Sequence, residues 1–437
     1  MNASVRLRIR ELIDATPWID THEHLVEEHN RLSDRAYAFV DTLGSRGSIP
    51  PGWASLITDY ALADMISAGL DDSLAQRVRG DALAPREKWE IVQPYFEAAR
   101  ATGYLRAVDV TTERLFGLRL DDESIEEVDR CCRELCRPGY YKYVLRSIAN
   151  VERCQVNSLE EDPFCGTATP ELLDQDLSIV RLVGGRHERA ERLAGLDVGS
   201  LDDYLDVVTW CFERYGRRAV AVKCQWAYLR TLAVGPVDGA PRREFERLRR
   251  GELHTEDRRR VEDFIFWRCL DLAAEQRLPV KLHLGYLDGN RQPLLASVFD
   301  HVADVASLVQ RRPDVTFVLM HAAWPQQSQV IAMAKHFPNV AVDLCWAWIL
   351  APLGTARFVT EFLTSAPATK LLCFGGDYTT VETVVGHAEL ARRGLELALC
   401  ELVDRGWLRV SEVLELIPVL MRENAERLLP SPRAQLG

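Results

Sequence analysis

Short apolar runs that alternate with amphipathic stretches constrain the fold of this chain most strongly. The eight apolar runs lie at 18–20, 143–148, 177–183, 219–223, 279–283, 315–321, 340–344 and 371–374. Helical periodicity lies between them, for example at 201–215, 258–276 and 327–336. Short buried strands that alternate with helices indicate parallel β/α units. Eight such units predict an α/β protein with a closed (β/α)8 barrel, the TIM-barrel fold.

The chain is longer than a barrel requires, and the surplus lies mainly in one block. A plain barrel takes about 250 residues, whereas this chain has 437. Residues 25–140 show helical patterns and no clear strand alternation. We therefore predict a barrel formed by 1–24 and 141–430, a helical insertion at 25–140 and a tail at 431–437. The insertion is expected either to act as a lid over a substrate site or to form a structural layer of helices.

Charge and cysteine content narrow the partners and the compartment. The net charge is −12 and no basic patch is evident, so neither nucleic acid nor a membrane surface is expected as a partner. No apolar run reaches the ~18 residues of a membrane span, and the start of the chain is typical of a short helix rather than a signal peptide. Eleven cysteines without a Cys-x-x-Cys pair argue against a disulfide framework. We expect a cytoplasmic protein that acts on a small molecule and that could form a homo-oligomer.

Residues with metal-binding side chains end several predicted strands. His22 and His24 end the first run, and residues i and i+2 of a strand point to one face, so their imidazoles lie side by side. The fourth, fifth, sixth and eighth runs are followed or ended by Lys223, His283, His321 and Asp377. Taken singly, each would more often be structural, but the C-terminal strand ends of a barrel meet at one mouth. Histidines converging with a carboxylate predict a divalent-cation site, compatible with Zn²⁺, Mn²⁺ or Fe²⁺.

These motifs resemble those of the amidohydrolase superfamily of metal-dependent hydrolases. The resemblance spans the whole barrel and is most specific at DTHEHL, LHLGY, FVLMHAAWP and FGGDYTT. Residues 313–429 are similar to the amidohydrolase-related branch, which includes a domain fused to glutamine-synthetase-like proteins. The insertion, with Trp89, Tyr95 and the sequence TGYLRA at 102–107, resembles that of uronate isomerases, which belong to the same superfamily.

The resemblance implies ligand roles for the residues at the strand ends. His22, His24 and Asp377 would bind a first metal, and His283 would be a further ligand. His321 would be either a second-metal ligand or a catalytic acid/base. Lys223 would be either a carboxylated bridge between two metals or a cation that binds substrate. The expected cofactor is therefore one or two divalent ions, zinc first, with manganese or iron as alternatives.

The resemblance also implies a reaction. A metal-activated water would cleave an amide or other C–N bond, or an ester or lactone, of a small carboxylate-bearing substrate. Asp377 would act as the general base, and His321 would polarise the carbonyl group. Decarboxylation and uronate-type isomerisation are alternatives on the same site. A catalytically inactive binding protein is an alternative of another class.

Substrate contacts are predicted from residues that follow the strands or lie in the insertion. Arginines at a barrel mouth indicate a substrate carboxylate, and tryptophans indicate an apolar or ring-shaped wall. The candidates are Arg230, Trp346, Tyr228, Arg106 in the insertion and Arg146, which is expected in the second strand. For each of them the alternative is a packing role or a surface ion pair.

Overall fold

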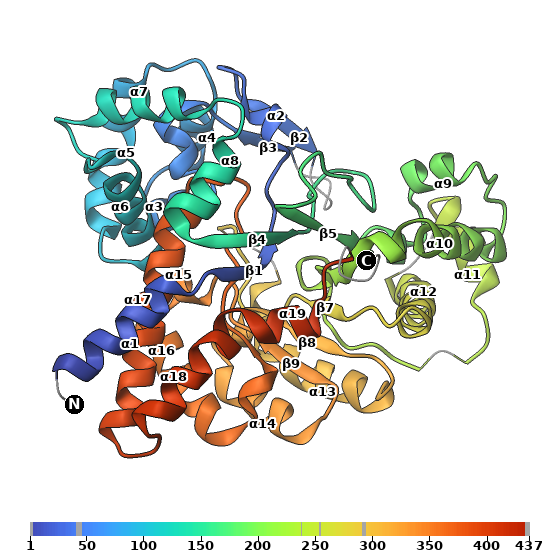
Figure 1. Cartoon of the computed structure of the whole chain (residues 1–437). Coiled ribbons are helices and arrows are strands. Elements are labelled where there is room, and N and C mark those ends of the chain that lie inside the picture. Colours follow the sequence, from blue (N-terminus) through green and yellow to red (C-terminus); the bar gives the residue numbers. More distant parts are fainter. Residues whose placement is uncertain (1–2, 41–45, 237, 253–254, 291–293, 433–437) are drawn as a thin grey trace.

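The computed structural model describes residues 3–40, 46–236, 238–252, 255–290 and 294–432 and forms a parallel β-barrel (Figure 1). Its eight strands pair in sequence order, each parallel to the next. The strands are β1 (Trp18–Glu23), β4 (Val151–Val156), β5 (Leu173–Ser178), β6 (Ala219–Cys224), β7 (Val280–Leu282), β8 (Phe317–Leu319), β9 (Val340–Asp343) and β10 (Leu371–Leu372). The predicted TIM-barrel fold is confirmed.

Hydrogen bonds between β1 and the segment after β10 close the barrel. Thr21 N donates to Phe374 O, Asp377 N to His22 O and His24 N to Tyr378 O, each at 2.9 Å. The closure therefore brings the chain after β10 directly against the two histidines of β1.

Helices surround the barrel, and the last of them covers one end. The longer ones are α1 (Ala3–Ala15), α10 (Leu201–Tyr215), α12 (Thr255–Glu275), α13 (His301–Arg311), α14 (Gln327–His336), α16 (Pro352–Ser365), α17 (Val384–Asp404) and α18 (Val410–Pro418). Shorter ones are α9 (Glu188–Ala194), α11 (Arg242–Arg249), α15 (Ala347–Leu350) and α19 (Asn424–Leu428). Ile19, Val220 and Leu372 pack with Ala425 and Leu429 in a separate apolar cluster at the end of the barrel opposite the histidines. No helix in the described ranges is long and apolar enough to cross a membrane.

Two strand predictions are wrong in position because polar side chains occupy the strands. The second strand is not at 143–148, where the chain forms a π-helical turn, η2 (Tyr143–Ala149); it is β4, with the sequence VERCQV. The third strand is β5, with the sequence LDQDLS, rather than 177–183. Inside the barrel Asp176 binds Lys281, with Nζ to Oδ2 at 2.8 Å and both side chains fully buried. A strand that carries such a buried pair has no apolar signature in the sequence.

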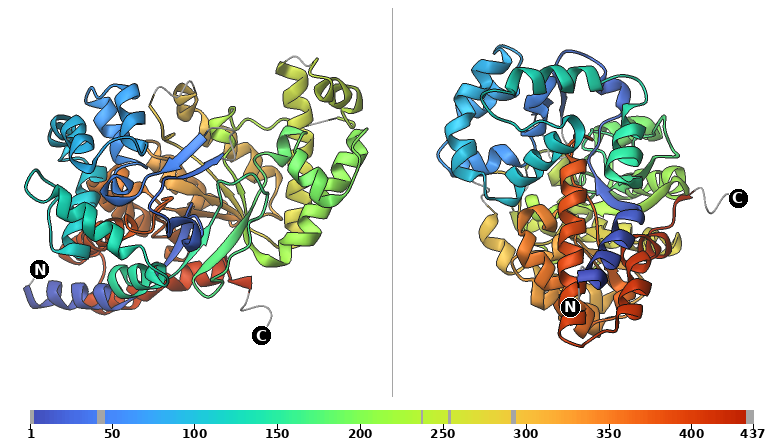
Figure 2. Two further views of the ribbon diagram at one scale, coloured as in Figure 1. Left: turned by 90° about the horizontal axis from the view of Figure 1, so that it is seen from above. Right: turned by 60° about the vertical axis from the view of Figure 1, so that its left-hand side comes forward.

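The insertion is mainly helical and also contains a hairpin that the sequence did not predict. Its helices are α2 (Glu28–Arg31), α3 (Ala61–Ser67), α4 (Asp72–Arg79), α5 (Pro85–Ala99), α6 (Gly103–Phe116), α7 (Ile125–Leu135) and α8 (Tyr140–Lys142), with a 3-10 turn η1 (Gly52–Leu56). β2 (Tyr37–Val40) and β3 (Arg46–Ile49) form an antiparallel pair. The insertion helices lie together above the C-terminal helices in the right-hand view of Figure 2. Trp53, Trp89 and Phe96 of the insertion belong to the same apolar core as the barrel, so the two parts pack as one body.

The first residue of the predicted tail, Ser431, packs against the barrel. Ser431 is buried and its Oγ donates to Asp174 Oδ1 at 2.7 Å, so at this position the tail prediction is wrong. The tail residues 433–437 lie outside the described residues.

Candidate metal centre

Two residues of β1 and one residue after β10 form the centre of the site. His22 Nε2 and His24 Nε2 each lie 3.1 Å from Asp377 Oδ1. All three residues are buried. Two nitrogens and one carboxylate oxygen at this spacing fit the ligand set of a divalent cation.

The hydrogen bonding of His24 turns its Nε2 atom toward Asp377. His24 Nδ1 lies 2.6 Å from the carbonyl oxygen of Asn157, which can only accept, so the neutral imidazole carries its proton on Nδ1. Nε2 lies 3.1 Å from Asp377 Oδ1 and 3.4 Å from Gln225 Nε2. An imidazole nitrogen this close to a carboxylate oxygen has the arrangement of two ligands of one cation. The residues present therefore fit a metal ion.

His283 and His321 form a hydrogen-bonded pair beside this centre. His283 Nε2 donates to Tyr286 O at 2.9 Å, and its Nδ1 accepts from His321 Nε2 at 2.9 Å. Burial lowers the pKa of His283 to about 3 and that of His321 well below its ordinary value, so both rings are neutral. His321 Nδ1 is left without a proton, 3.9 Å from Asp377 Oδ2, and has no hydrogen-bond partner among the described residues. The structure does not bring His283 into the group formed by His22, His24 and Asp377.

Asp20 and Glu23 hold the backbone of this centre rather than its imidazole rings. Asp20 Oδ1 accepts from His22 N at 3.0 Å and Gly376 N at 3.3 Å, and Glu23 Oε2 accepts from Tyr378 N at 2.7 Å. Burial raises the pKa of Asp20 to about 7, and burial together with the neighbouring Asp20 carboxyl group raises the pKa of Glu23 well above its ordinary range. The two carboxyl groups thus tie β1 to the segment that carries Asp377.

Lys223 reaches the centre from the end of β6. Its Nζ lies 3.3 Å from His22 Nε2 and 2.6 Å from Met320 Sδ, and the side chain is fully buried. Burial lowers the pKa of Lys223 to about 8, so the amine can lose its proton near neutral pH.

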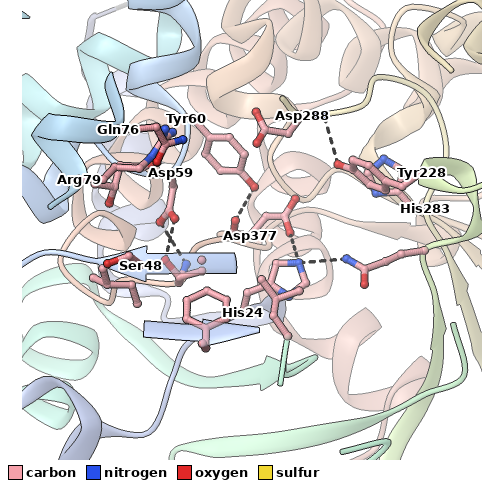
Figure 3. A pocket seen from close by; sticks show the side chains of 17 residues that line it. His24, Ser48, Asp59, Tyr60, Gln76, Arg79, Tyr228, His283, Asp288 and Asp377 are labelled. Carbon is pink, nitrogen blue, oxygen red and sulfur yellow. Dashed lines mark hydrogen bonds and ion pairs between the residues drawn. The ribbon is translucent and has the colours of Figure 1, made fainter. Parts of the chain in front are cut away.

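A cavity of about 370 Å³ separates the strand ends from the insertion (Figure 3). On the barrel side it is lined by His24, Gln225, Tyr228, His283, Asp288, Asp377 and Thr379. On the insertion side it is lined by Ser48 and its neighbours in the hairpin, and by Thr58, Asp59, Tyr60, Gln76 and Arg79. We call the last five residues the insertion wall.

The insertion wall presents polar groups to the cavity. Arg79 makes one hydrogen bond, to Thr58 O at 3.4 Å, and no ion pair with a carboxylate in the part of the chain that the structure describes. Asp59 accepts from Thr379 N and Thr379 Oγ1, at 3.1 and 2.6 Å, so it anchors the loop after Asp377. The Tyr60 hydroxyl donates to the Asp377 carbonyl oxygen. The insertion therefore completes the site as well as covering it.

Asp288 faces the same cavity from the loop after β7. Burial raises its pKa to about 7, and its Oδ1 has no hydrogen-bond partner among the described residues. The Tyr228 hydroxyl accepts from Asp288 N at 3.1 Å and holds this loop in place.

The substrate residues predicted from the sequence fall into two groups. Tyr228 lines the cavity, with its ring centroid 4.7 Å from that of His283, and the buried Trp346 has its ring 5.2 Å from that of His321. The three arginines do not line this cavity. Arg230 forms ion pairs with Glu262 and Asp263, and Arg106 forms one with Asp109. Arg146 lies in η2 rather than in a strand, and it donates to the carbonyl oxygens of Glu152 and Glu171.

Several residues at the site were not predicted from the sequence. Asp59, Tyr60 and Arg79 belong to the insertion, where no strand end marks a functional position. Asp288 lies five residues beyond His283, inside a loop. Cys345 follows β9 and would have been found by extending the strand-end rule to the seventh run.

The structure thus combines a TIM barrel with a His22, His24 and Asp377 cluster that could hold a metal ion, and comparison with known proteins places it in a family. The family model described as "Amidohydrolase" matches residues 194–430, which is more than half of the chain. The chain therefore belongs to the amidohydrolase family, and the resemblance inferred from the sequence is confirmed.

The curated relative is a longer protein. Protein fluG of Emericella nidulans is 27% identical over 174 residues, which cover 38% of this chain and 20% of fluG. The matched segment thus spans about a fifth of that relative.

Solved structures match over nearly the whole chain at low identity. A uronate isomerase from Thermotoga maritima has a TM-score of 0.77 and 17% identity, covering 98% of each chain. A glucuronate isomerase from Caulobacter crescentus has a TM-score of 0.73 and 16% identity, covering 98% of this chain and 94% of its own. A putative metal-dependent hydrolase from Lactobacillus casei has a TM-score of 0.64 and 15% identity, covering 97% and 98%. These likenesses establish a shared fold, insertion included.

Proposed function

We propose that this protein is a cation-dependent isomerase that interconverts the aldose and ketose forms of a small sugar acid. The observation that carries the proposal is the polar cavity between the strand ends and the insertion wall. Carboxyl, phenol, amide and guanidinium groups line it, which suits a ligand with several hydroxyl groups and one carboxylate. The similarity of the fold to uronate isomerases, insertion included, supports the same function.

His22, His24 and Asp377 would hold the cation. When bound, the cation would supply a Lewis acid that polarises a substrate carbonyl or hydroxyl oxygen. The cation is expected to be Zn²⁺, with Mn²⁺ or Fe²⁺ as alternatives, since the histidine and carboxylate ligands accept all three.

Asp288 is proposed as the group that moves the proton between the two carbons of the substrate. A general base works best when its pKa is near the working pH, and burial brings Asp288 to about 7. Its Oδ1 has no hydrogen-bond partner among the described residues, so a substrate hydroxyl group could supply one. Tyr228 would keep the carboxyl group oriented through its hydrogen bond to Asp288 N.

Arg79 is proposed as the ligand of the substrate carboxylate. It is the cation of the insertion wall, and no protein carboxylate forms an ion pair with it in the described ranges. A guanidinium group binds a carboxylate with two parallel hydrogen bonds. Gln76, one turn earlier in α4, would add an amide contact to the same end of the substrate.

Hydrolysis is the second candidate, and the position of Lys223 favours it. Its amine lies 3.3 Å from His22 Nε2, and burial lowers its pKa to about 8, which brings it closer to the neutral form that a lysine needs before it can be carboxylated. Under this proposal Asp377 would accept a proton from water and return it to the leaving group, with His321 beside the carbonyl oxygen.

Product analysis separates the two candidates. We expect the purified protein, loaded with Zn²⁺ or Mn²⁺, to convert an aldohexuronate into the ketose, detected by NMR without release of ammonia or amine. Release of amine from a panel of N-acyl amino acids and amides, without ketose formation from any uronate, would replace isomerisation by hydrolysis. Tight binding of a uronate without turnover, with or without the cation, would favour an inactive binding protein.

A further inference from the structure

One side of the cavity is apolar, unlike the strand ends and the insertion wall. Phe39 and Ile49 of the hairpin and Leu159, in the loop after β4, line this side. The Tyr37 hydroxyl donates to Glu160 Oε1 at 3.0 Å, so the hairpin and the loop are tied to each other. We call Phe39, Ile49 and Leu159 the apolar wall. The rest of the cavity lining is mostly polar or ionisable, so the apolar wall calls for an explanation of its own.

Packing within the hairpin fixes the ring of Phe39 in this wall. Phe39 and Gly47 are paired across the two strands, so their side-chain positions lie on one face of the hairpin. A Cβ atom on Gly47 would lie 2.4 Å from Cζ and 2.6 Å from Cε2 of Phe39, so the ring lies directly against the glycine backbone. The Tyr37 ring stacks beside it, with ring centroids 6.1 Å apart. The ring position therefore depends on a glycine at 47.

Leu159 places part of the apolar wall close to the candidate metal centre. It lies two residues beyond Asn157, whose carbonyl oxygen is 2.6 Å from His24 Nδ1. Phe39 and Leu159 are only half-buried, so both keep apolar surface that a ligand can cover. A ligand that fills the cavity between the metal centre and Arg79 would contact this surface.

An apolar wall is a poor surface for an unmodified sugar acid. Such a molecule carries a hydroxyl group on nearly every carbon, and a hydroxyl group buried against apolar side chains loses its hydrogen bonds to water. An alkyl group on the ligand gains affinity at the same surface, by about tenfold or more for one carbon. The proposed function assigns the reacting carbons to Asp288 and the carboxylate to Arg79. The alkyl group must therefore be attached to a carbon between these two ends.

We propose that the substrate is an O-alkylated sugar acid, with a small alkyl ether between its reacting carbons and its carboxylate. The inference rests on the proposed function, because Asp288 and Arg79 define the two ends of the substrate. Phe39, Ile49 and Leu159 are then specificity-determining residues, which contact the alkyl group and take no part in proton transfer. They favour the ether over the parent acid because the ether has no hydroxyl hydrogen to leave unpaired at that position.

Comparison of matched substrates tests the proposal. We expect the Zn²⁺-loaded, full-length protein to convert the 3-O-methyl or the 4-O-methyl ether of an aldohexuronate with a kcat/KM at least about tenfold above that of the parent acid. Leu159→Asn and Phe39→Gln should bring this ratio close to one. Val40→Thr is the matched control, since Val40 points to the opposite face of the same strand and is 48% exposed, and it should keep the wild-type ratio.

The outcomes separate this inference from the proposed function. Turnover of the parent acid, with an equal or lower kcat/KM for both ethers, would overturn the inference and leave the isomerase proposal standing. If no uronate is turned over, isothermal titration calorimetry supplies the readout. Tighter binding of an ether than of the parent acid, lost in Leu159→Asn, would then support the alkylated ligand without isomerisation, whereas absence of that preference would overturn both. Should the variants fail to fold, the wild-type ratio decides by itself.

Discussion

The strand ends of the barrel and the insertion wall face each other across one cavity, but they are built on different principles. The barrel rim, which we define as His22, His24, Lys223, His321 and Asp377, projects from hydrogen-bonded strands and is fully or almost fully buried. The insertion wall comes from turns and a helix, and Arg79 within it is only partly buried. Under the proposed function, the rim would hold the cation and the wall would select the substrate.

Removal of a rim ligand should have the largest effect. His22→Ala is expected to lose one equivalent of cation and to lower kcat at least about a thousandfold, because the Lewis acid contributes several kcal/mol to the transition state. Elemental analysis and steady-state kinetics measure both. His29→Ala, at an exposed position on α2, is the control and should change neither. Equal metal content in the two variants would contradict the assignment.

Substitution of Asp288 should lower the catalytic rate strongly without removing the cation. Asp288→Asn is expected to lower kcat about 10²- to 10⁴-fold while cation content stays at the wild-type value. A base must be ionised to accept a proton, so wild-type kcat should rise with pH through about 7, the pKa of Asp288. The variant should lack this rising limb. A variant that kept the same pH profile would show that another group carries the proton.

Arg79 tests the insertion wall directly. Arg79→Gln should raise KM about 10- to 100-fold for a substrate with a carboxylate, since a hydrogen bond to a charged group contributes about 1.5–3 kcal/mol. The effect should vanish for the corresponding neutral sugar, and cation content should be unchanged. Arg77→Gln, at an exposed position of the same helix, is the matched control. Equal losses for the acid and the neutral sugar would remove the distinction between rim and wall.

The Gly376→Ala substitution should have the smallest effect, and it should lower the stability of the protein rather than change its substrate specificity. A Cβ atom at Gly376 would lie 1.8 Å from Glu23 Oε1, so Gly376→Ala must displace the buried carboxyl group that ties β1 to the Asp377 segment. We expect a loss of about 1–3 kcal/mol in the free energy of unfolding, measured by urea denaturation. Gly184→Ala, where a Cβ meets nothing within 4 Å, should change it little.

The sequence by itself determined the barrel and the residues of its rim. In parallel β/α units every strand presents its C-terminal end to the same mouth, so a histidine or aspartate that follows an apolar run has a predictable position. His22, His24, Lys223, His321 and Asp377 were located in this way, and the family assignment followed from the same motifs.

Only the tertiary structure decided the rest. β4 and β5 escaped prediction because the barrel pairs charged residues such as Asp176 and Lys281 in its interior, and hydropathy cannot report a pairing between distant segments. The same reason explains why Arg230, predicted as a substrate ligand, is paired with Glu262 and Asp263, whereas Arg79 is not paired with a carboxylate in the described ranges. Which nitrogen of His24 or His321 faces Asp377 depends on carbonyl groups and rings brought close by folding, and no pattern along the chain encodes those contacts.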